Sequence, residues 1–281
     1  MAIKSAGALE RPATPILKWA GGKGRLLEQY TPLFPKTFNR YFEAFLGGGA
    51  VFFRLSSGDQ PLRATLSDNN GELINCYKMV KENVEAVLTE LQTMHNDKSF
   101  FYKVRALDPS ELTDVERAAR LIFLNKTCFN GLYRENSKGQ FNVPFGKYKN
   151  PKIADGDNLR AASKAFAKTT LLHAPFEKVL SRAKSGDFVY LDPPYQPLSK
   201  TANFTAYTRN SFSFQDQERL AELAAALDRK GVLVMLSNSD TPEVRELYQA
   251  FSIRTVRAGR AINCRGDRRG SISELVIRNY E

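Results

Sequence analysis

The sequence is poor in residue types that define several common classes of protein. Its three cysteines, Cys76, Cys128 and Cys264, lie far apart and form no CxxC pair. They therefore make neither a disulfide framework nor a zinc site, and they favour a reducing, cytosolic compartment. The two histidines, His95 and His173, argue against a His-based triad and a His-rich metal site. We expect no bound metal.

Long apolar runs are also missing. No stretch approaches the roughly 18 apolar residues that a membrane span needs. Residues 1–15, MAIKSAGALERPATP, have no apolar core of the kind found in signal peptides. No internal repeat or low-complexity tract is visible. We therefore expect a cytoplasmic protein that contacts no membrane, with a flexible tail over residues 1–15.

Basic residues are in clear excess. There are 41 Lys and Arg against 30 Asp and Glu, which gives a net charge of +11. An excess of this size favours a polyanionic partner such as nucleic acid. Residues 117–168 carry 11 basic and 3 acidic side chains, and residues 251–281 carry 7 and 3. The first segment also interleaves Phe, Tyr, Asn and Arg with Gly, which suits a surface that enters DNA grooves or stacks on bases.

Short apolar runs with sharp ends predict strands, and helical patterns lie between them. One helix begins after Ser213, where Asp216 completes a capping-box-like pair. A second begins at Pro242 and runs to about Phe251. The predicted strands are Arg40–Phe45, Leu62–Ser67, Thr169–His173, Phe188–Asp192, Val232–Ser237, Ile253–Arg257 and Ile272–Arg278.

The alternation of strands and helices predicts an α/β fold with a mostly parallel sheet. Residues 258–271 join the last two strands and are too few for a crossover helix, so this pair is expected to be antiparallel. Residues 76–166 depart from this alternation, because they contain helical patterns over Val84–His95 and Asp114–Asn125 but no predicted strand. We interpret residues 76–166 as a mainly helical insert. Residues 16–75 and 167–281 then form one catalytic domain.

The first motif with chemical content is a glycine-rich turn. Phe45-Leu46-Gly47-Gly48-Gly49 follows a predicted strand and precedes an apolar run. A strand, a glycine turn and a helix form a common site for nucleoside cofactors, because the backbone can approach the ligand closely. Asp68 ends the next predicted strand, where an acid commonly binds ribose hydroxyls. Asp68 could equally serve as a turn residue in Asp-Asn-Asn-Gly.

The second motif is Lys18-Trp19-Ala20-Gly21-Gly22-Lys23. It resembles a phosphate loop only loosely. A Walker motif needs Gly at position 17 and Ser or Thr at position 24, and these positions hold Leu17 and Gly24. The segment is therefore not a triphosphate site. Its Trp19 is either a ligand contact or a core residue beside a turn.

The third and most specific motif is Asp192-Pro193-Pro194-Tyr195, directly after a predicted strand. An amine conjugated to a base ring is a poor nucleophile. The Asp192 carboxylate and the Pro193 carbonyl can accept its two N–H bonds and free its lone pair, while Tyr195 offers a ring for stacking on an extruded base. A purely structural proline turn is the alternative.

Together these segments resemble the Dam-type DNA adenine methyltransferases from Leu17 to about Val276. The order of the cofactor motif, the insert and DPPY is that of the alpha group of amino-methyltransferases. The matching pieces are KWAGGK (18–23), EAFLGGGAVFF (43–53), SDNNGELI (67–74), NGLYREN (130–136), FNVPFGKY (141–148), DPPY (192–195) and TANFTAYTRNSF (201–212). Where the family often has Val before its glycines, this chain has Leu46, a conservative change.

The resemblance implies a Rossmann-like S-adenosylmethionine-dependent methyltransferase sheet with an inserted, mainly helical DNA-recognition domain. It implies S-adenosylmethionine as the methyl donor and adenine in double-stranded DNA, within GATC, as the acceptor. It also implies base flipping and transfer of the methyl group in one in-line step, without a metal or a covalent enzyme intermediate. A bacterial, nucleoid-associated monomer is the expected state. Whether a restriction enzyme accompanies the protein stays open.

The resemblance also assigns roles to residues. Lys18 and Tyr148 match readers of the outer guanine, with Leu132 packed nearby. Arg134 and Pro144 match readers of the second half of the site. Phe129 stands where the family uses Tyr as a wedge, and Asn130 matches a phosphate contact. The implied catalytic residues are Asp192, Pro193, Pro194 and Tyr195, and the implied cofactor contacts are Trp19, Lys23, Phe45, Gly47, Gly49, Asp68, Phe176 and Asp192.

Two alternatives fit part of the pattern. Amino-methyltransferases that act on RNA or on a protein glutamine share an (Asp/Asn)-Pro-Pro-Tyr pocket, but that interpretation gives no reason for NGLYREN and FNVPFGKY. A DNA-binding protein with an inactive methyltransferase fold is the other. The intact Asp192, Asp68 and glycine turn argue against it.

Overall fold

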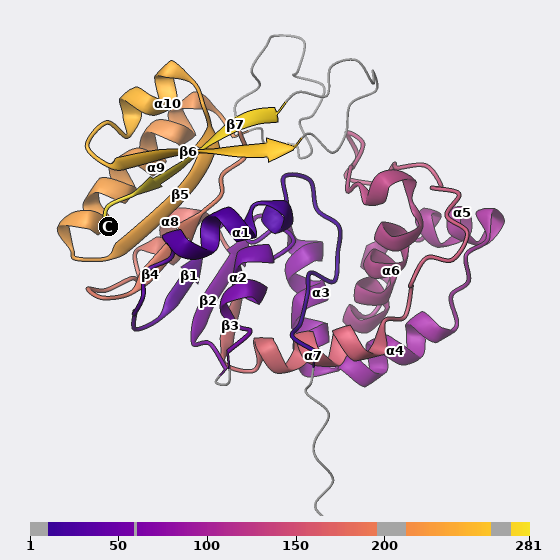
Figure 1. The fold of residues 1–281 in the computed structure, drawn as a ribbon. Coiled ribbons are helices and arrows are strands. Elements are labelled where there is room, and N and C mark those ends of the chain that lie inside the picture. The colour runs from indigo at the N-terminus through magenta and orange to yellow at the C-terminus, as the bar shows by residue number, and fades with distance from the viewer. Residues whose placement is uncertain (1–10, 59–60, 196–211, 260–270) are drawn as a thin grey trace, which may run out of the picture.

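A computed structural model of the chain describes residues 11–58, 61–195, 212–259 and 271–281. At its centre is a seven-stranded sheet in the order β3-β2-β1-β4-β5-β7-β6 (Figure 1). The strands are β1 (Tyr41–Glu43), β2 (Ala64–Asp68), β3 (Thr169–His173), β4 (Phe188–Leu191), β5 (Leu233–Ser239), β6 (Ser252–Gly259) and β7 (Ser271–Arg278). Each corresponds to one of the predicted apolar runs, so all of the predicted strands are confirmed.

The strand order of the sheet reverses direction between β1 and β4. β1 to β5 are parallel, and β7 is antiparallel to both β5 and β6. The predicted mostly parallel sheet with an antiparallel final pair is therefore confirmed. The chain proceeds outward from β1 through β2 to β3 and then returns to β4 on the other side of β1. Ligands of open α/β sheets bind at the carboxyl ends of strands where the order switches in this way.

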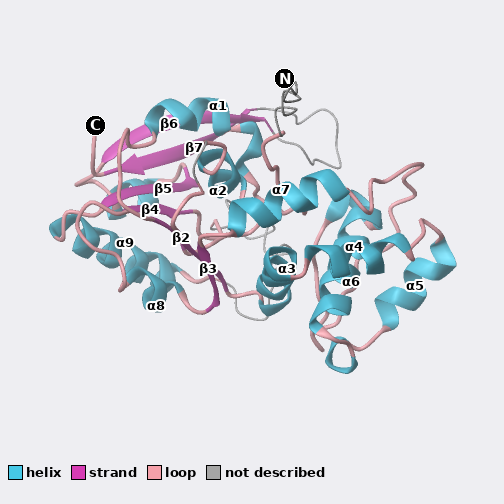
Figure 2. Cartoon of the chain, turned by 90° about the horizontal axis from the view of Figure 1, so that it is seen from below, coloured by secondary structure: helices cyan, strands magenta, loops and turns pink. Residues whose placement is uncertain are grey.

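Both faces of the sheet are covered because successive side chains of a strand point to opposite sides. In β1, Tyr41 joins one hydrophobic core and Phe42 joins the other. The first core includes α2 (Ala50–Leu55), and the second includes α8 (Phe176–Leu180), α9 (Phe214–Arg229) and α10 (Pro242–Leu247). Figure 2 shows α8 and α9 on the opposite side of the sheet from α1 (Leu27–Tyr30).

Helices from the middle of the chain form a lobe beside the sheet (Figure 1). They are α3 (Gly71–Glu82), α4 (Val84–Gln92), α5 (Lys98–Ala106), α6 (Asp114–Thr127) and α7 (Gly156–Phe166). The predicted boundary between residues 75 and 76 lies inside α3. This helix packs against β2 and β3 as well as α6 and α7, so it joins the lobe to the sheet.

The predicted helices are present, with two corrections at their ends. The helix expected to reach His95 ends at Gln92, where the Thr93 and Met94 amides donate to carbonyls three residues back and tighten the last turn. The helix expected to reach Phe251 ends at Leu247. Tyr248 leaves helical geometry there and buries its ring in the second core. The capping box at Ser213 and Asp216 is confirmed.

The chain between α6 and α7 contains little regular structure. A single 3-10 turn, η4 (Phe129–Gly131), follows α6, and isolated bridges pair Cys128 with Phe145 and Glu135 with Phe141. We call residues 128–149 the recognition loop, after the role that the family resemblance predicts for them. Two of its residues, Asn130 and Lys147, adopt left-handed backbone conformations. The predicted pattern of aromatic and basic residues thus occupies an irregular surface loop.

Several expectations fall at the margins of the described residues. Residues 1–10 of the predicted tail, Cys264 and residues 201–211 lie outside them. Within residues 11–15, the Thr14 amide donates to Asn158 Oδ1 of α7 at 2.9 Å. Across the described chain, no helix has both the length and the apolar character required to cross a membrane.

Candidate active site

The polar residues of the three motifs meet at the carboxyl edge of the sheet. The glycine turn follows β1, Asp68 ends β2 and Asp192 follows β4. β1 pairs directly with both β2 and β4, so these three positions are neighbours. The antiparallel β7 adds Glu274, which pairs in register with Ser239 of β5. One edge of the sheet therefore gathers residues from five strands and the loops that follow them.

Asp68 holds the glycine turn by its backbone. The Gly47 amide donates to Asp68 Oδ2 at 2.9 Å, and the Asn70 amide donates to Oδ1 at 2.9 Å. The Tyr77 hydroxyl donates to the Gly47 carbonyl at 2.7 Å. Burial raises the pKa of Asp68, and the backbone N–H donors oppose that shift. The turn is thus fixed before any ligand arrives.

Trp19 lies against the glycine turn. A Cβ on Gly47 would lie 2.9 Å from Trp19 Cδ1, and Gly47 also has a φ of +47°. Only glycine meets both conditions at this position. The Trp19 ring stacks on Tyr133 of the recognition loop, with ring centroids 5.2 Å apart. Trp19 therefore connects the glycine turn to the recognition loop.

Three phenylalanines form an apolar wall next to the turn. Phe45 lies 5.4 Å from Phe176 and 5.6 Å from Phe212 between ring centroids. Phe176, the first residue of α8, lies 6.0 Å from Phe212. Phe45 and Phe176 were predicted as cofactor contacts, and the structure brings them together on the same side as the turn. Aromatic faces of this kind pack well against a planar base.

Asp192 is held through one of its two oxygens. Lys23 Nζ lies 2.8 Å from Asp192 Oδ1, and the Ser237 hydroxyl donates to the same oxygen at 2.9 Å. Ser237 Oγ lies 2.9 Å from the Tyr190 hydroxyl. Because Ser237 uses its only proton on Asp192, Tyr190 is the donor in this second bond. Among the described residues, no hydrogen bond reaches Oδ2, so this oxygen can accept from a substrate.

The backbone after Asp192 is also supported. Gln217 of α9 is fully buried and donates from Nε2 to the Pro194 carbonyl at 3.2 Å. Asn238 of β5 donates in turn to Gln217 Oε1 at 3.0 Å. Pro193 is buried, whereas Pro194 is exposed. The Pro194 carbonyl is thus oriented by α9.

Tyr195 is tied to β7. Its hydroxyl donates to Glu274 Oε2 at 2.8 Å, and Lys23 Nζ lies 4.7 Å from its ring centroid. Lys23 is only 4% exposed, donates to the Gly21 carbonyl at 2.8 Å and lies 3.9 Å from Glu274 Oε2. Burial raises the pKa of Glu274, and Lys23 opposes that shift. Lys23, predicted as a cofactor contact, thus joins two acids and the Tyr195 ring.

A further buried acid lies at the end of β1. Glu43 is 2% exposed and accepts from the Tyr41 hydroxyl at 2.8 Å. Burial raises the pKa of Glu43 to about 8, so the carboxyl group is mostly protonated near neutral pH. Glu43 therefore adds no full negative charge beside Asp68 and Asp192 under those conditions.

The residues predicted to contact DNA lie in the recognition loop and beside it. Lys18 Nζ lies 4.7 Å from the Tyr148 ring centroid, so the two predicted readers of the outer guanine are in contact. Phe129 is 51% exposed, and its amide donates to the Pro144 carbonyl at 2.8 Å. The exposed Arg134 donates from Nε to Asn142 Oδ1 at 2.7 Å. Asn130 is also exposed, and Leu132 is partly buried against the core.

Sequence reasoning missed several residues of this region: Glu43, Asn125, Gln217, Ser237 and Glu274. Gln217 lies in the polar stretch QDQER and gives no local signal. The other four each lie within or next to an apolar run. Buried polar groups need partners, so such a residue indicates an internal network. Their partners, however, come from distant parts of the chain and cannot be read from local sequence.

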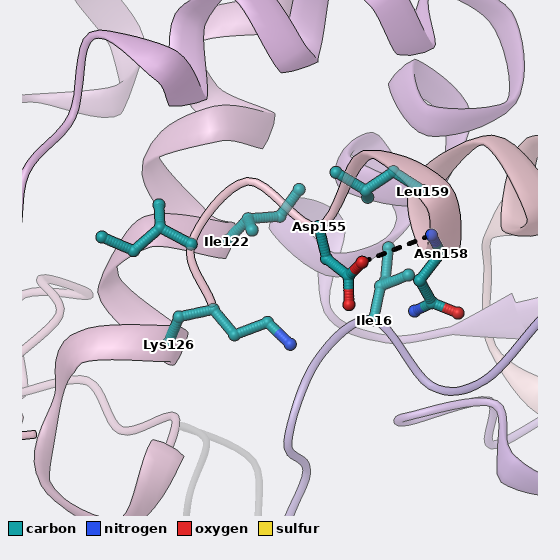
Figure 3. A pocket seen from close by; sticks show the side chains of 7 residues that line it. Ile16, Ile122, Lys126, Asp155, Asn158 and Leu159 are labelled. Atoms are coloured by element: carbon teal, nitrogen blue, oxygen red, sulfur yellow. Dashed lines mark hydrogen bonds between the residues drawn. The ribbon is translucent and has the colours of Figure 1, made fainter. Parts of the chain in front are cut away.

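A separate small hollow lies away from the sheet edge, beside α6 and α7. Figure 3 shows Asp155 in this hollow, accepting from the Asn158 amide at 3.5 Å. Its volume is about 10 Å³, far below the roughly 300 Å³ at which ligand pockets begin. It is lined by Ile16, Ile122, Lys126, Ile153, Asp155, Asn158 and Leu159. The described residues also contain no cluster of three or more His, Cys, Asp or Glu side chains that could hold a metal ion.

The chain is similar to known proteins over nearly its whole length. The family described as D12 class N6 adenine-specific DNA methyltransferase matches residues 19–262. The Type II methyltransferase M1.LlaDCHI of Lactococcus lactis subsp. cremoris is 45% identical over 275 residues, which cover 95% of this chain and 95% of that protein. The Type II methyltransferase M.MjaIII of Methanocaldococcus jannaschii is 44% identical over 285 residues, covering 95% and 99%. The DNA adenine methylase of Escherichia coli is 37% identical over 265 residues, or 93% of each chain.

Proposed function

The chain belongs to the D12 class of N6 adenine-specific DNA methyltransferases, and we propose that it methylates the exocyclic amine of adenine within GATC in duplex DNA. The observation that carries this proposal is the meeting of two motifs at one sheet edge. The glycine turn, which Asp68 holds, follows β1. The Asp192-Pro193-Pro194-Tyr195 turn follows β4, which pairs with β1. Donor and acceptor sites are therefore neighbours.

The family implies S-adenosylmethionine as the methyl donor, and the residues at the sheet edge fit it. The bare Cα of Gly47, the carboxylate of Asp68 and the rings of Phe45 and Phe176 provide the close approach, the hydroxyl acceptor and the apolar wall that a nucleoside needs. When bound, the cofactor supplies a methyl group on a positively charged sulfur. We assign Trp19, Lys23, Phe45, Gly47, Gly49, Asp68, Phe176 and Asp192 to its binding.

The chain's own residues then prepare the amine of the adenine. Asp192 Oδ2 and the Pro193 carbonyl accept its two N–H bonds, which draws the nitrogen lone pair out of the ring. Ser237 and Lys23 keep Oδ1 in place, so Oδ2 keeps its direction. The Tyr195 ring provides a stacking face for the extruded base, at a position set by Glu274. Extrusion itself costs a few kcal/mol, which contacts in the pocket offset.

The mainly helical insert, residues 76–166, is the proposed DNA-recognition part. Its basic surface gives salt-dependent, sequence-independent binding. Lys18 and Tyr148, with Leu132 beside them, are assigned to the outer guanine, and Arg134 and Pro144 to the second half of the site. Phe129 enters the base stack, and Asn130 contacts a phosphate. The exposed positions of Phe129, Asn130 and Arg134 support these assignments.

The alternatives have less support. Family membership favours DNA over RNA or a protein glutamine as substrate. An inactive fold would have no need for the supported Asp192 turn. One extruded base requires one active site, so a monomer working in the bacterial cytoplasm is sufficient for the proposed reaction.

The test is transfer of labelled methyl groups from S-adenosylmethionine to short duplexes. One duplex contains GATC, and the others each carry one changed base pair. Methylation confined to the GATC adenine supports the whole proposal. Methylation of other adenines as well would keep the activity and overturn the recognition assignments. Transfer to RNA or to a protein substrate, with none to DNA, would overturn the substrate itself.

A further inference from the structure

Asn125 lies in the last turn of α6, is fully buried and makes its hydrogen bonds outside the helix. Its Oδ1 accepts from the Lys18 amide at 2.8 Å. Its Nδ2 donates to the Lys18 carbonyl at 2.8 Å and to the Gly131 carbonyl at 3.0 Å. One side-chain amide thus satisfies both backbone groups of Lys18, as a neighbouring β-strand would.

Lys18 has no regular secondary structure of its own to position it. Gly131, which has no side chain, lets the Lys18 side chain pack closely. A Cβ on Gly131 would lie 2.4 Å from Lys18 Cδ and 2.8 Å from Lys18 Cβ. Asn125 thus holds the backbone of Lys18, and Gly131 lies against its side chain. The Lys18 side chain extends to the Tyr148 ring.

We infer that Asn125 is a positioning residue that sets sequence discrimination through Lys18. This inference rests on the proposed function, in which Lys18 and Tyr148 read the outer guanine. A hydrogen bond to a base edge depends on direction as well as distance. Asn125 makes no contact with DNA in this scheme. It fixes the point from which the Lys18 side chain starts.

The chemistry of the amide explains why Asn suits this position. Asp has the same size and could still accept from the Lys18 amide, but it cannot donate to the carbonyls of Lys18 and Gly131. Ala offers neither contact. Either change leaves buried carbonyl groups without a partner, so the Lys18 backbone would shift to find one.

The experiment measures kcat/KM of Asn125→Asp and Asn125→Ala on GATC duplexes and on duplexes with one changed pair. The quantity of interest is the ratio between the cognate and the changed duplex. The fraction of active enzyme cancels in this ratio, so a loss of stability alone does not alter it. We expect the ratio for the outer guanine to fall at least about fivefold. The ratios for the positions assigned to Arg134 should stay within about twofold.

Thr127→Val is the matched control. Thr127 is buried two residues further along the same helix, and its hydroxyl donates only to the Phe123 carbonyl within α6. Its loss should lower stability and leave every ratio unchanged. In a Lys18→Ala background, Asn125→Asp should produce no further change at the outer guanine, because the residue it acts through is absent.

Gly131→Ala provides a second route if the Asn125 variants do not fold. The added methyl group would lie 2.4 Å from Lys18 Cδ, so it displaces the Lys18 side chain and should produce the same selective fall. Unchanged ratios, or an equal fall at every position, would overturn the inference while the wild-type enzyme still methylates GATC. Failure of the wild-type enzyme on GATC duplexes would instead overturn the proposed function.

Discussion

The sheet edge and the recognition loop differ in how far their side chains are buried. At the sheet edge, side chains hold one another: Lys23 pairs with Asp192, and Tyr195 donates to Glu274. The recognition loop is held by backbone hydrogen bonds and by side-chain bonds such as that of Arg134 to Asn142, and several of its side chains are exposed. The Phe129 amide donates to the Pro144 carbonyl, for example, while the Phe129 ring is 51% exposed.

This difference fits what each region has to do under the proposed function. Chemistry on a poor nucleophile needs donors and acceptors that are already oriented, because reorganising them during the reaction would add to the barrier. Reading DNA needs side chains that can reach a partner outside the protein, so the scaffold orients the backbone and leaves the tips free. Changes at the sheet edge should therefore affect rate, and changes in the recognition loop should affect choice of sequence.

The strongest test of this division is Asp192→Asn. The change keeps the shape and removes the charge that faces Lys23. We expect kcat to fall by roughly 10²- to 10³-fold or more, with duplex binding within about twofold of wild type. Single-turnover methylation and fluorescence anisotropy measure the two quantities. Asp187→Asn is the control, since Asp187 is a buried acid at the other end of β4, paired with Arg40. It should cost stability and leave the rate of the folded enzyme intact.

The next largest effect is expected for Arg134→Ala, which should lower selectivity between GATC and altered sites. A good base contact discriminates by about 1–3 kcal/mol, or roughly 5- to 150-fold. The kcat/KM ratio between GATC and duplexes altered in the second half of the site should fall within that range. Lys138→Ala, an exposed charge of the same loop, should weaken binding equally for all sequences. A selectivity profile identical to wild type for Arg134→Ala would contradict the assignment.

Glu43→Gln tests the sheet edge through its pH dependence. Glu43 has a pKa near 8 in the folded protein and 4.5 as its ordinary value. Between these values the folded state keeps a proton that the unfolded state releases, so this group makes wild-type stability fall as pH rises, by up to about 1.4 kcal/mol per pH unit. Urea unfolding should show Glu43→Gln gaining on wild type from pH 5 to 8.

The matched control for that slope lies in the helical lobe. Asp97 caps α5 and accepts from the Phe100 amide at 2.8 Å, which lowers its pKa. Its stabilisation is present above its ordinary pKa and is lost as pH falls. Asp97→Asn should therefore lower stability by a constant amount between pH 5 and 8. A Glu43→Gln difference that is equally flat would show that Glu43 is ionised in the fold.

Phe129→Ala should have the smallest effect of the four. Its ring supplies only part of the contacts that offset unstacking. We expect a few-fold fall in methylation rate and a weaker fluorescence rise from 2-aminopurine placed at the target adenine. Phe214→Ala removes another exposed ring, at the start of α9, and should change neither quantity. Equal effects of the two changes would argue against a wedge.

The sequence predicted the central strands well because they are buried on both faces and read as apolar runs, such as FVYL in β4. Helix ends were less certain. The helix after Pro242 stops early because Tyr248 packs into the core, which is a tertiary effect. Asp68 and Asp192 could be found because Asp68 ends a predicted strand and Asp192 lies at the end of another.

Glu274 and Asn125 could not be found in this way. Glu274 reaches Tyr195 only because β7 pairs with β5 in the sheet. Asn125 has the appearance of an ordinary residue near the end of an amphipathic helix, and its partner Lys18 lies far away in the sequence. Short-range patterns identify the residues that carry the chemistry. The residues that hold them in place depend on topology.

The pairing of Lys23 with Asp192 and Glu274 has a consequence for how the protein folds. This cluster joins a segment before β1 to β4 and to β7, so it closes some of the longest loops in the fold. Contacts between such distant segments form late, because the chain must first lose the entropy of closing those loops. A nascent or partly folded chain can therefore complete its helical lobe before the cluster around Asp192 forms.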